Sequence, residues 1–154
     1  MSRHRVLTPL RWSDMDAYGH INNVQFLRLL EEARVIALAD GLPTGGDLAS
    51  TGLIVSRSEI EYLTPLLYRP APIAIDLWVT RIGAADFDMA YEVLDRTADG
   101  GGPGTIFARA ETNLVAFDLQ TQRPRRISGP EKERLEGWSD KPIRWRRRRG
   151  ASAR

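Results

Sequence analysis

The spacing of apolar residues changes along the chain, from a helical period early on to a strict alternation later. In the early part, apolar residues recur three or four positions apart, as on one face of a helix, at Phe26, Leu29, Leu30, Ala33, Ile36 and Ala37. Asn22 or Asn23 is a suitable N-cap. We expect this helix to run to about Ala39, before Gly41 and Pro43 end it.

The predicted helix is apolar around most of its circumference. Val24, Leu27, Val35 and Leu38 widen the apolar stripe until few polar residues interrupt it. A helix with so little polar surface needs to be enclosed by other structure rather than to lie on a surface. We therefore expect the rest of the chain to wrap around it.

The later part of the chain predicts a sheet. Its segments rich in Val, Ile, Tyr, Phe and Thr read as strands, at Ile54 to Leu63, Ile73 to Ile82, Met89 to Leu94 and Ile106 to Leu119. In the second of these, apolar residues at every other position indicate a sheet with one buried face. No helical segment separates the strands, which indicates an antiparallel meander. A further short strand is expected within Arg3 to Arg11.

Together these elements predict an α+β fold, a single domain in which a long central helix is wrapped by an antiparallel β-sheet. Near its end, Ser128-Gly-Pro-Glu131 fits a capping box with proline in the first turn, which predicts a final helix reaching Gly137. We place the domain at residues 1–137. The remainder, 138–154, is basic and has few apolar residues, and we expect it to be a disordered tail.

Length and charge agree with this division. The chain has 154 residues, of which 42% are hydrophobic and 27% charged, enough for one domain with a core of its own. Residues 1–140 hold 15 basic against 20 acidic residues, whereas 141–154 hold 7 basic and none acidic. The overall charge of +2 therefore combines a body of −5 with a tail of +7. The high pI of 9.3 is a property of the tail.

Several function classes are excluded by composition. The chain has no cysteine, which removes disulfide scaffolds, cysteine-type zinc sites and thiol catalysis. With His4 and His20 as the only histidines, we expect no metal site. No apolar run approaches the length of a membrane span, and the N-terminus lacks an apolar run of signal-peptide length, so we expect a cytoplasmic protein.

One segment before the helix carries candidate chemistry, namely Arg11-Trp-Ser-Asp14-Met-Asp16-Ala-Tyr-Gly19-His20-Ile-Asn22-Asn23. A loop carboxylate placed beside a helix N-terminus lies near backbone N–H groups that have no partner within the helix. Thioester hydrolysis needs a nucleophile or general base together with donors for the oxyanion that develops on the carbonyl oxygen. Asp16 suits the first role and the helix amides suit the second, while Gly19 lets the backbone bend close to a substrate.

This segment resembles the hotdog-fold acyl-CoA thioesterases, in particular the 4-hydroxybenzoyl-CoA thioesterase-like family, which carry a D-x-D-x-x-G-[HIV] element before the long helix. A D-x-D-x-x-x-H-x-N-N element followed nine residues later by Glu is also found in plant-type acyl-carrier-protein thioesterases, and that Glu corresponds here to Glu32. The resemblance continues through Glu61 to Pro65, Phe87 and Asp118 to Pro124, and so spans roughly Arg5 to Ile127.

The resemblance implies a hydrolase that acts on an acyl-CoA or acyl-carrier thioester. In this family the second Asp of the motif is the catalytic carboxylate, which corresponds to Asp16, and a helix amide seven residues later, here that of Asn23, polarises the thioester. Glu32 is a third catalytic candidate. Substrate-binding candidates are Gly19, His20, Phe26, Arg81 and Arg125. The resemblance also implies edge-to-edge homodimers or homotetramers with sites at the interface, and no cofactor, because coenzyme A arrives with the substrate.

Each candidate also has a structural interpretation. We expect Asp14 to organise the loop as a hydrogen-bond acceptor, while Asn22 and Asn23 are explained as caps apart from the Asn23 amide. Glu32 either finds a partner such as Arg34 or lines the site. The stretch Gly83 to Phe87 departs from the family, because Asp86 stands where a base would assist coenzyme A binding.

Three other functions compete with this one. A non-catalytic acyl-thioester-binding protein of the same fold remains the alternative to the enzyme. A nucleic-acid contact through Arg144 to Arg149, with Trp145 available for stacking, is disfavoured because the body is acidic. An enoyl-CoA hydratase needs an Asp and a His five positions apart, whereas Asp14 and Asp16 lie six and four positions before His20.

Overall fold

The computed structural model describes residues 3–41, 52–95 and 104–146. Its elements follow the expected order, with bounds β1 (His4–Thr8), the 3-10 helix η1 (Trp12–Asp14), α1 (Asn23–Gly41), β2 (Leu53–Tyr62), β3 (Ile73–Ile82), β4 (Asp86–Leu94), β5 (Ile106–Asp118), β6 (Arg123–Pro124) and α3 (Gly129–Gly137). None of the helices in the described ranges is both long and apolar enough to span a membrane.

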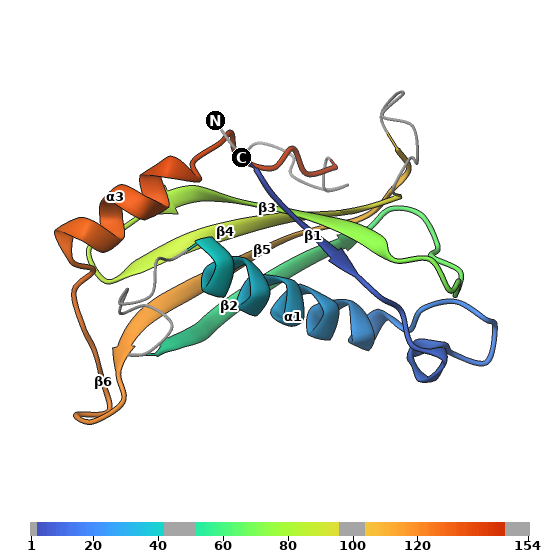
Figure 1. Ribbon diagram of the computed structural model, residues 1–154, viewed down its shortest axis with the longest axis horizontal. Coiled ribbons are helices and arrows are strands. Elements are labelled where there is room, and N and C mark those ends of the chain that lie inside the picture. Colours follow the sequence, from blue (N-terminus) through green and yellow to red (C-terminus); the bar gives the residue numbers. More distant parts are fainter. Residues whose placement is uncertain (1–2, 42–51, 96–103, 147–154) are drawn as a thin grey trace, which may run out of the picture.

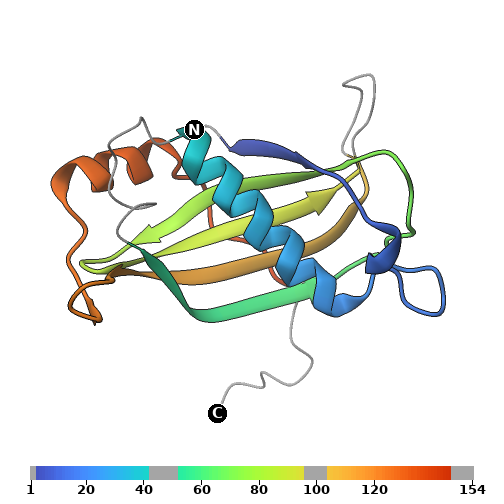
Figure 2. The same cartoon turned by 60° about the horizontal axis from the view of Figure 1, so that its bottom comes forward.

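The strands form one antiparallel sheet in the order β1-β3-β4-β5-β2, and the short β6 pairs with β5. Helix α1 lies diagonally across one face of this sheet (Figure 1, Figure 2). The core between them includes Leu29, Leu30, Leu77, Tyr91 and Leu114, all fully buried. This confirms the predicted α+β hotdog architecture, but β2 pairs with β5 and not with β3, so the predicted simple meander is wrong for β2.

Within the single chain, the sheet encloses α1 on one side only. Phe26, Leu30 and Ala33 are buried against the sheet. On the opposite side of the helix, however, Val24 and Val35 are well exposed, and Leu27 and Ile36 are partly so. One sheet covers only one side of a helix, so the apolar stripe is wider than the surface that this chain offers to bury it.

Strand β3 departs from the predicted single buried face. Ala74, Asp76 and Trp78, on the side away from α1, are buried as well. The segment after α3 crosses this side of the sheet, where the Trp78 indole N–H donates to the carbonyl of Lys141 at 2.8 Å. Figure 1 shows this red segment and α1 on opposite sides of the sheet. The alternating residues of β3 therefore point to two faces of the sheet that are both covered, and neither face is open to solvent.

Helix α3 is the capped helix that the sequence predicted. The Ser128 side chain accepts from the Glu131 amide, and the Glu131 carboxylate accepts from the Ser128 amide at 2.7 Å. Beyond Gly137, part of the basic segment contacts the body, with the Arg109 guanidinium donating to the Arg144 carbonyl at 3.1 Å. Residues 147–154 of the expected tail lie outside the described residues, and the division at residue 137 remains a prediction.

Candidate active site

The loop between β1 and α1 is organised by Asp14, which is only 1% exposed. Its carboxylate accepts the backbone N–H of Arg11 at 2.8 Å and the Arg11 guanidinium at 3.0 Å. Its carbonyl accepts the Asn22 N–H at 2.9 Å, which ties the loop to the start of the helix. Asp14 therefore has the loop-organising role that the sequence suggested, and none of the cavities described below involves it.

Asp16 lies two residues further along and is held differently. Its Oδ1 atom accepts the backbone N–H groups of Tyr18 at 2.8 Å and His20 at 3.1 Å. Its backbone N–H donates to the His20 carbonyl at 2.7 Å. Within the described part of the chain, no hydrogen bond reaches Oδ2. The loop thus fixes one carboxylate oxygen by backbone donors and leaves the other available for chemistry.

Gly19 makes this loop possible through its backbone conformation. Its φ is +77°, in the left-handed region that residues with a Cβ rarely adopt. A Cβ built at this position would meet no atom within 4 Å. The conformation therefore accounts for the glycine here, and close packing against the rest of the chain does not.

The helix start presents a free donor beside Asp16. Asn22 is the N-cap, because its side-chain oxygen accepts the Val24 N–H at 3.0 Å. Asn23 is the first helical residue, and its N–H donates to no other described residue. The Asn23 carbonyl in turn accepts the Tyr62 hydroxyl at 2.9 Å. Burial raises the pKa of Tyr62, so its hydroxyl stays protonated as a donor at neutral pH.

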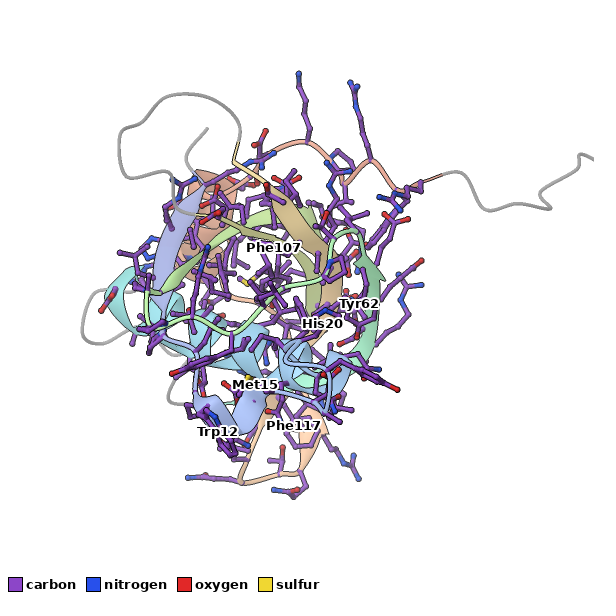
Figure 3. The ribbon with its side chains drawn as sticks, turned by 90° about the vertical axis from the view of Figure 1, so that its right-hand side faces the viewer. Trp12, Met15, His20, Tyr62, Phe107 and Phe117 are labelled. Atoms are coloured by element: carbon purple, nitrogen blue, oxygen red, sulfur yellow. The ribbon has the colours of Figure 1, made fainter. Side chains whose placement is uncertain are left out.

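These groups border one cavity of about 310 Å³. Its walls come from the loop, the first turns of α1, and the end of β2 with the segment that follows, and consist of Asp16, His20, Ile21, Asn23, Phe26, Tyr62, Leu63, Thr64, Pro65 and Leu66. The rings of Phe26 and Tyr62 pack edge to face with centroids 5.4 Å apart. His20 and Tyr62 appear next to each other in Figure 3, which views this end of the molecule.

The structure thus brings together Asp16, His20, Asn23 and Phe26 from the predicted set. Sequence reasoning missed the contribution of Tyr62 and the residues after it as walls of the site. The available signal was the resemblance of Glu61 to Pro65 to the family, which indicated relatedness without indicating a position in the fold.

Glu32 does not join this cavity within one chain. Its side chain is 43% exposed and lies 3.7 Å from the Arg28 guanidinium, so Arg28, and not Arg34, is its partner. It borders a different cavity of about 420 Å³, on the exposed side of α1, together with Arg28, Glu31, Val35 and Ile36. The helical period explains this placement, because nine positions after Asn23 correspond to about two and a half turns and hence to the opposite face.

The two arginines considered for coenzyme A binding are engaged by acids away from the cavity. Arg81 pairs with Asp88 and Asp86 at the β3–β4 hairpin, and hydrogen bonds to these carboxylates raise its pKa. Arg125 makes two hydrogen bonds to Glu131, at 2.7 and 2.9 Å. Neither arginine lines any of the cavities described here. Over residues 3–41, 52–95 and 104–146, no group of three or more metal-ligating side chains is arranged to hold a metal ion.

Comparison with known proteins agrees with this geometry. The family model described as the thioesterase-like superfamily matches residues 10–137. The long-chain acyl-CoA thioesterase FadM of Escherichia coli K12 is 27% identical over 132 residues, which cover 82% of this chain and 92% of FadM.

Solved structures show the same fold. A thioesterase complexed with coenzyme A and Zn from Thermus thermophilus superposes with a TM-score of 0.71 and 25% identity, covering 90% of this chain and 95% of that one. A 1,4-dihydroxy-2-naphthoyl-CoA thioesterase from Synechocystis superposes with a TM-score of 0.70 and 20% identity, covering 87% and 96%. The chain belongs to the thioesterase-like superfamily, which confirms the family and the enzyme class, a thioester hydrolase, that the sequence predicted.

Proposed function

We propose that the protein hydrolyses acyl-CoA thioesters in the cavity at the N-terminus of α1, with Asp16 as the catalytic carboxylate. The observation that carries the proposal is that the Asp16 carboxylate and the residue bearing the free helix amide, Asn23, border the same cavity. FadM by its name acts on long-chain acyl-CoA, and the Thermus protein was solved with coenzyme A. Both support acyl-CoA over an acyl-carrier protein as the substrate.

The proposed mechanism divides the work between these two residues. The thioester carbonyl oxygen faces the Asn23 N–H, where the helix N-terminus stabilises the negative charge that develops during attack. Asp16 then acts in one of two ways. Either it attacks the carbonyl carbon and expels the thiolate, which leaves a mixed anhydride that water hydrolyses to the free acid, or it accepts a proton from a water that attacks the carbonyl carbon and displaces the thiolate. The backbone donors on Oδ1 orient the carboxylate for either role.

His20 and Phe26 complete the proposed substrate contacts. Phe26 is part of the core and also an apolar wall of the cavity, which suits the first carbons of an acyl group. The reaction consumes only water and the thioester. We therefore propose that no cofactor is needed beyond the coenzyme A of the substrate. We also keep, as a proposal, the expectation from the sequence that the enzyme acts in the cytoplasm.

The test is hydrolysis of a panel of acyl-CoA thioesters, read as release of free thiol, by the wild type and by Asp16→Asn. This variant keeps the size and the Oδ1 acceptor but removes the charge, so turnover should fall by about 10²-fold or more. Asp14→Asn is the matched control. It should lower stability, because it removes the charge that pairs with Arg11, and should affect turnover much less.

The outcomes separate the enzyme from the alternative of a non-catalytic binder. Near wild-type hydrolysis by Asp16→Asn would contradict the catalytic assignment. Absence of thiol release by the wild type with every thioester would contradict the hydrolase itself. In that case, titration of the same acyl-CoA compounds into the protein would decide whether it binds them without hydrolysis.

We also propose that the protein is a homodimer or a homotetramer. Strand β2 lies at an edge of the sheet, and exposed apolar residues occur both on it, at Ile54 and Val55, and on the outer side of α1. Unpaired edges and apolar surface of this kind favour association. Glu32 remains a catalytic candidate only if a second copy brings it near the site. Sedimentation velocity at micromolar concentration should show an oligomer, and a monomer would contradict the pairing.

A further inference from the structure

A third cavity lies further along α1 from the candidate active site. It measures about 300 Å³ and is lined by Leu27, Arg28, Leu30, Glu31, Arg34, Val55, Ser58 and Thr112. Arg34 follows Asn23 by eleven positions, which is close to three full helical turns, so both residues lie on the same face of α1. Ser58 and Tyr62 likewise lie on one face of β2, four positions apart. The active-site cavity and the third cavity therefore follow one another between α1 and β2, and we call the two together the groove.

Arg34 lies in this third cavity as a buried cation without an acidic partner among the described residues. It is 9% exposed, and its guanidinium donates to the Tyr91 hydroxyl at 3.0 Å. Among the described residues, no carboxylate lies within 4.0 Å of it. A buried charge normally has a counter-charge, because removing a charge from water costs several kcal/mol unless another charge compensates it.

The groups around Arg34 add polar atoms at the same point. Burial raises the pKa of Tyr91, so its hydroxyl stays protonated, accepts from Arg34 and also makes a hydrogen bond with the Thr112 side chain. Thr112 is buried next to it, and its hydroxyl lies 3.3 Å from that of Ser58. These donors lie in a groove whose other walls include Leu27 and Leu30, and such an arrangement suits an apolar chain that ends in an anion.

The charges at the cavity also favour an anion. Arg28 and Arg34 contribute two positive charges, while Glu31 is the one acid among the residues that line the cavity. Arg28 pairs with Glu32, which borders the neighbouring cavity. Glu31 is exposed at the surface, so it does not neutralise the buried guanidinium.

We propose that this cavity receives the far end of the acyl group and that Arg34 pairs there with a carboxylate, so that the preferred substrates are carboxy-ended, dicarboxylic acyl thioesters. This inference rests on the proposed function, since it assumes a thioester at Asp16 and Asn23. A methyl-ended chain of the same length would cover the guanidinium without replacing its hydration, whereas a carboxylate supplies charge-assisted hydrogen bonds.

The distance between the two sites determines which chain lengths are discriminated. Eleven residues at 1.5 Å per residue separate the Asn23 and Arg34 backbones by about 16 Å, and the Arg34 side chain shortens this span because helical side chains lean toward the N-terminus. A short carboxy-ended acyl group does not reach Arg34 and leaves its own charge in the apolar part of the groove. The preference should therefore appear only for medium-length acyl groups.

The experiment compares kcat/KM of the wild type for pairs of acyl-CoA thioesters of equal length, one methyl-ended and one carboxy-ended, over a series of lengths. The carboxy-ended member should be preferred by roughly tenfold to a hundredfold at the length that reaches Arg34, as a hydrogen bond to a charged group provides. A ratio near one at every length, with hydrolysis intact, overturns the inference and leaves the proposed function standing. Absence of hydrolysis with all members contradicts the proposed function instead.

Variants connect the preference to this cluster. Arg34→Met should lower the carboxy-to-methyl ratio to one or below, and Tyr91→Phe, a milder change in case the first variant does not fold, should lower it by a smaller factor. Arg57→Met is the matched control, because Arg57 is exposed and lies on the face of β2 away from the cavity. In the β2–β5 register it stands opposite Asn113, whereas Ser58 of the cavity stands opposite Thr112. It should keep the wild-type ratio. Full preference in folded Arg34→Met overturns the assignment to Arg34.

Discussion

Replacing Gly19 by alanine tests whether backbone conformation alone explains the glycine in the catalytic loop. An added methyl group at this position would meet no atom within 4 Å, so no steric cost is expected. The φ of +77° costs a residue with a Cβ about 1–2 kcal/mol. In the opposite direction, alanine lowers the conformational entropy of the unfolded chain, which stabilises the folded protein by about 0.4–1 kcal/mol. The free energy of unfolding of Gly19→Ala should therefore fall by about 1 kcal/mol.

Gly129→Ala is a control that differs in one respect. A Cβ at Gly129 also meets no atom within 4 Å, but this glycine begins α3 and does not have a positive φ. The unfolded-state gain applies to both variants, so Gly129→Ala should be stabilised by about 0.4–1 kcal/mol. The difference between the two variants then isolates the cost of the left-handed backbone.

Urea denaturation of the wild type and both variants supplies the measurement, with midpoints compared at an unchanged slope. Gly19→Asn should recover part of the loss, because asparagine tolerates the left-handed region better than alanine does. Equal stability of Gly19→Ala and Gly129→Ala would refute the reasoning. Thiol release by Gly19→Ala should also be reduced, because the turn that Gly19 closes positions the Asp16 carboxylate.

Two further predictions concern stability. Burial alone would raise the pKa of Glu131, but hydrogen bonds from Arg125 and Ser128 outweigh it and the net pKa lies below the ordinary 4.5. The resulting stabilisation is present above pH 4.5 and is lost as the pH falls through the folded-state pKa. In a plot of the urea midpoint against pH, Glu131→Gln should therefore reduce the loss of stability on the acid side. An unchanged acid side would contradict this linkage. Leu77→Ala, in the fully buried centre of β3, should lower the free energy of unfolding by about 2–5 kcal/mol in the same assay, and a loss well under about 1 kcal/mol would show that the core is not packed as described.

The sequence by itself determined the elements and the catalytic loop, because these depend on interactions between near neighbours. The apolar spacing located α1 to within two residues at each end, and the alternation located β3 at its observed bounds. The Ser128 and Glu131 capping box was readable for the same reason, since its hydrogen bonds span three residues. Asp16 and Asn23 were placed together because only one short turn separates them.

The sequence determines on which face of α1 a residue lies, but not what packs against that face. The helical period alone places Glu32 on the opposite face of α1 from Asn23, so its separation from the Asp16 cavity follows from spacing that is visible in the sequence. The same period places Arg34 on the face of Asn23. The burial of Arg34 against Tyr91, however, depends on which side chains of the sheet lie opposite α1. The same holds for the lack of an acidic partner of Arg34 among the described residues.

Only the tertiary structure decided which distant segments complete the site. Tyr62 joins Asn23 across 39 residues, through a contact that depends on how α1 crosses the sheet and not on any local pattern. Strand register likewise determines which acid pairs with Arg81. The path of the chain around and after α3 determines that Glu131 pairs with Arg125 and that the segment at Lys141 covers Trp78. Local periodicity specifies which face of an element is apolar. The choice of what packs against that face is made by long-range packing, in which many contacts of similar energy compete and the whole fold selects among them.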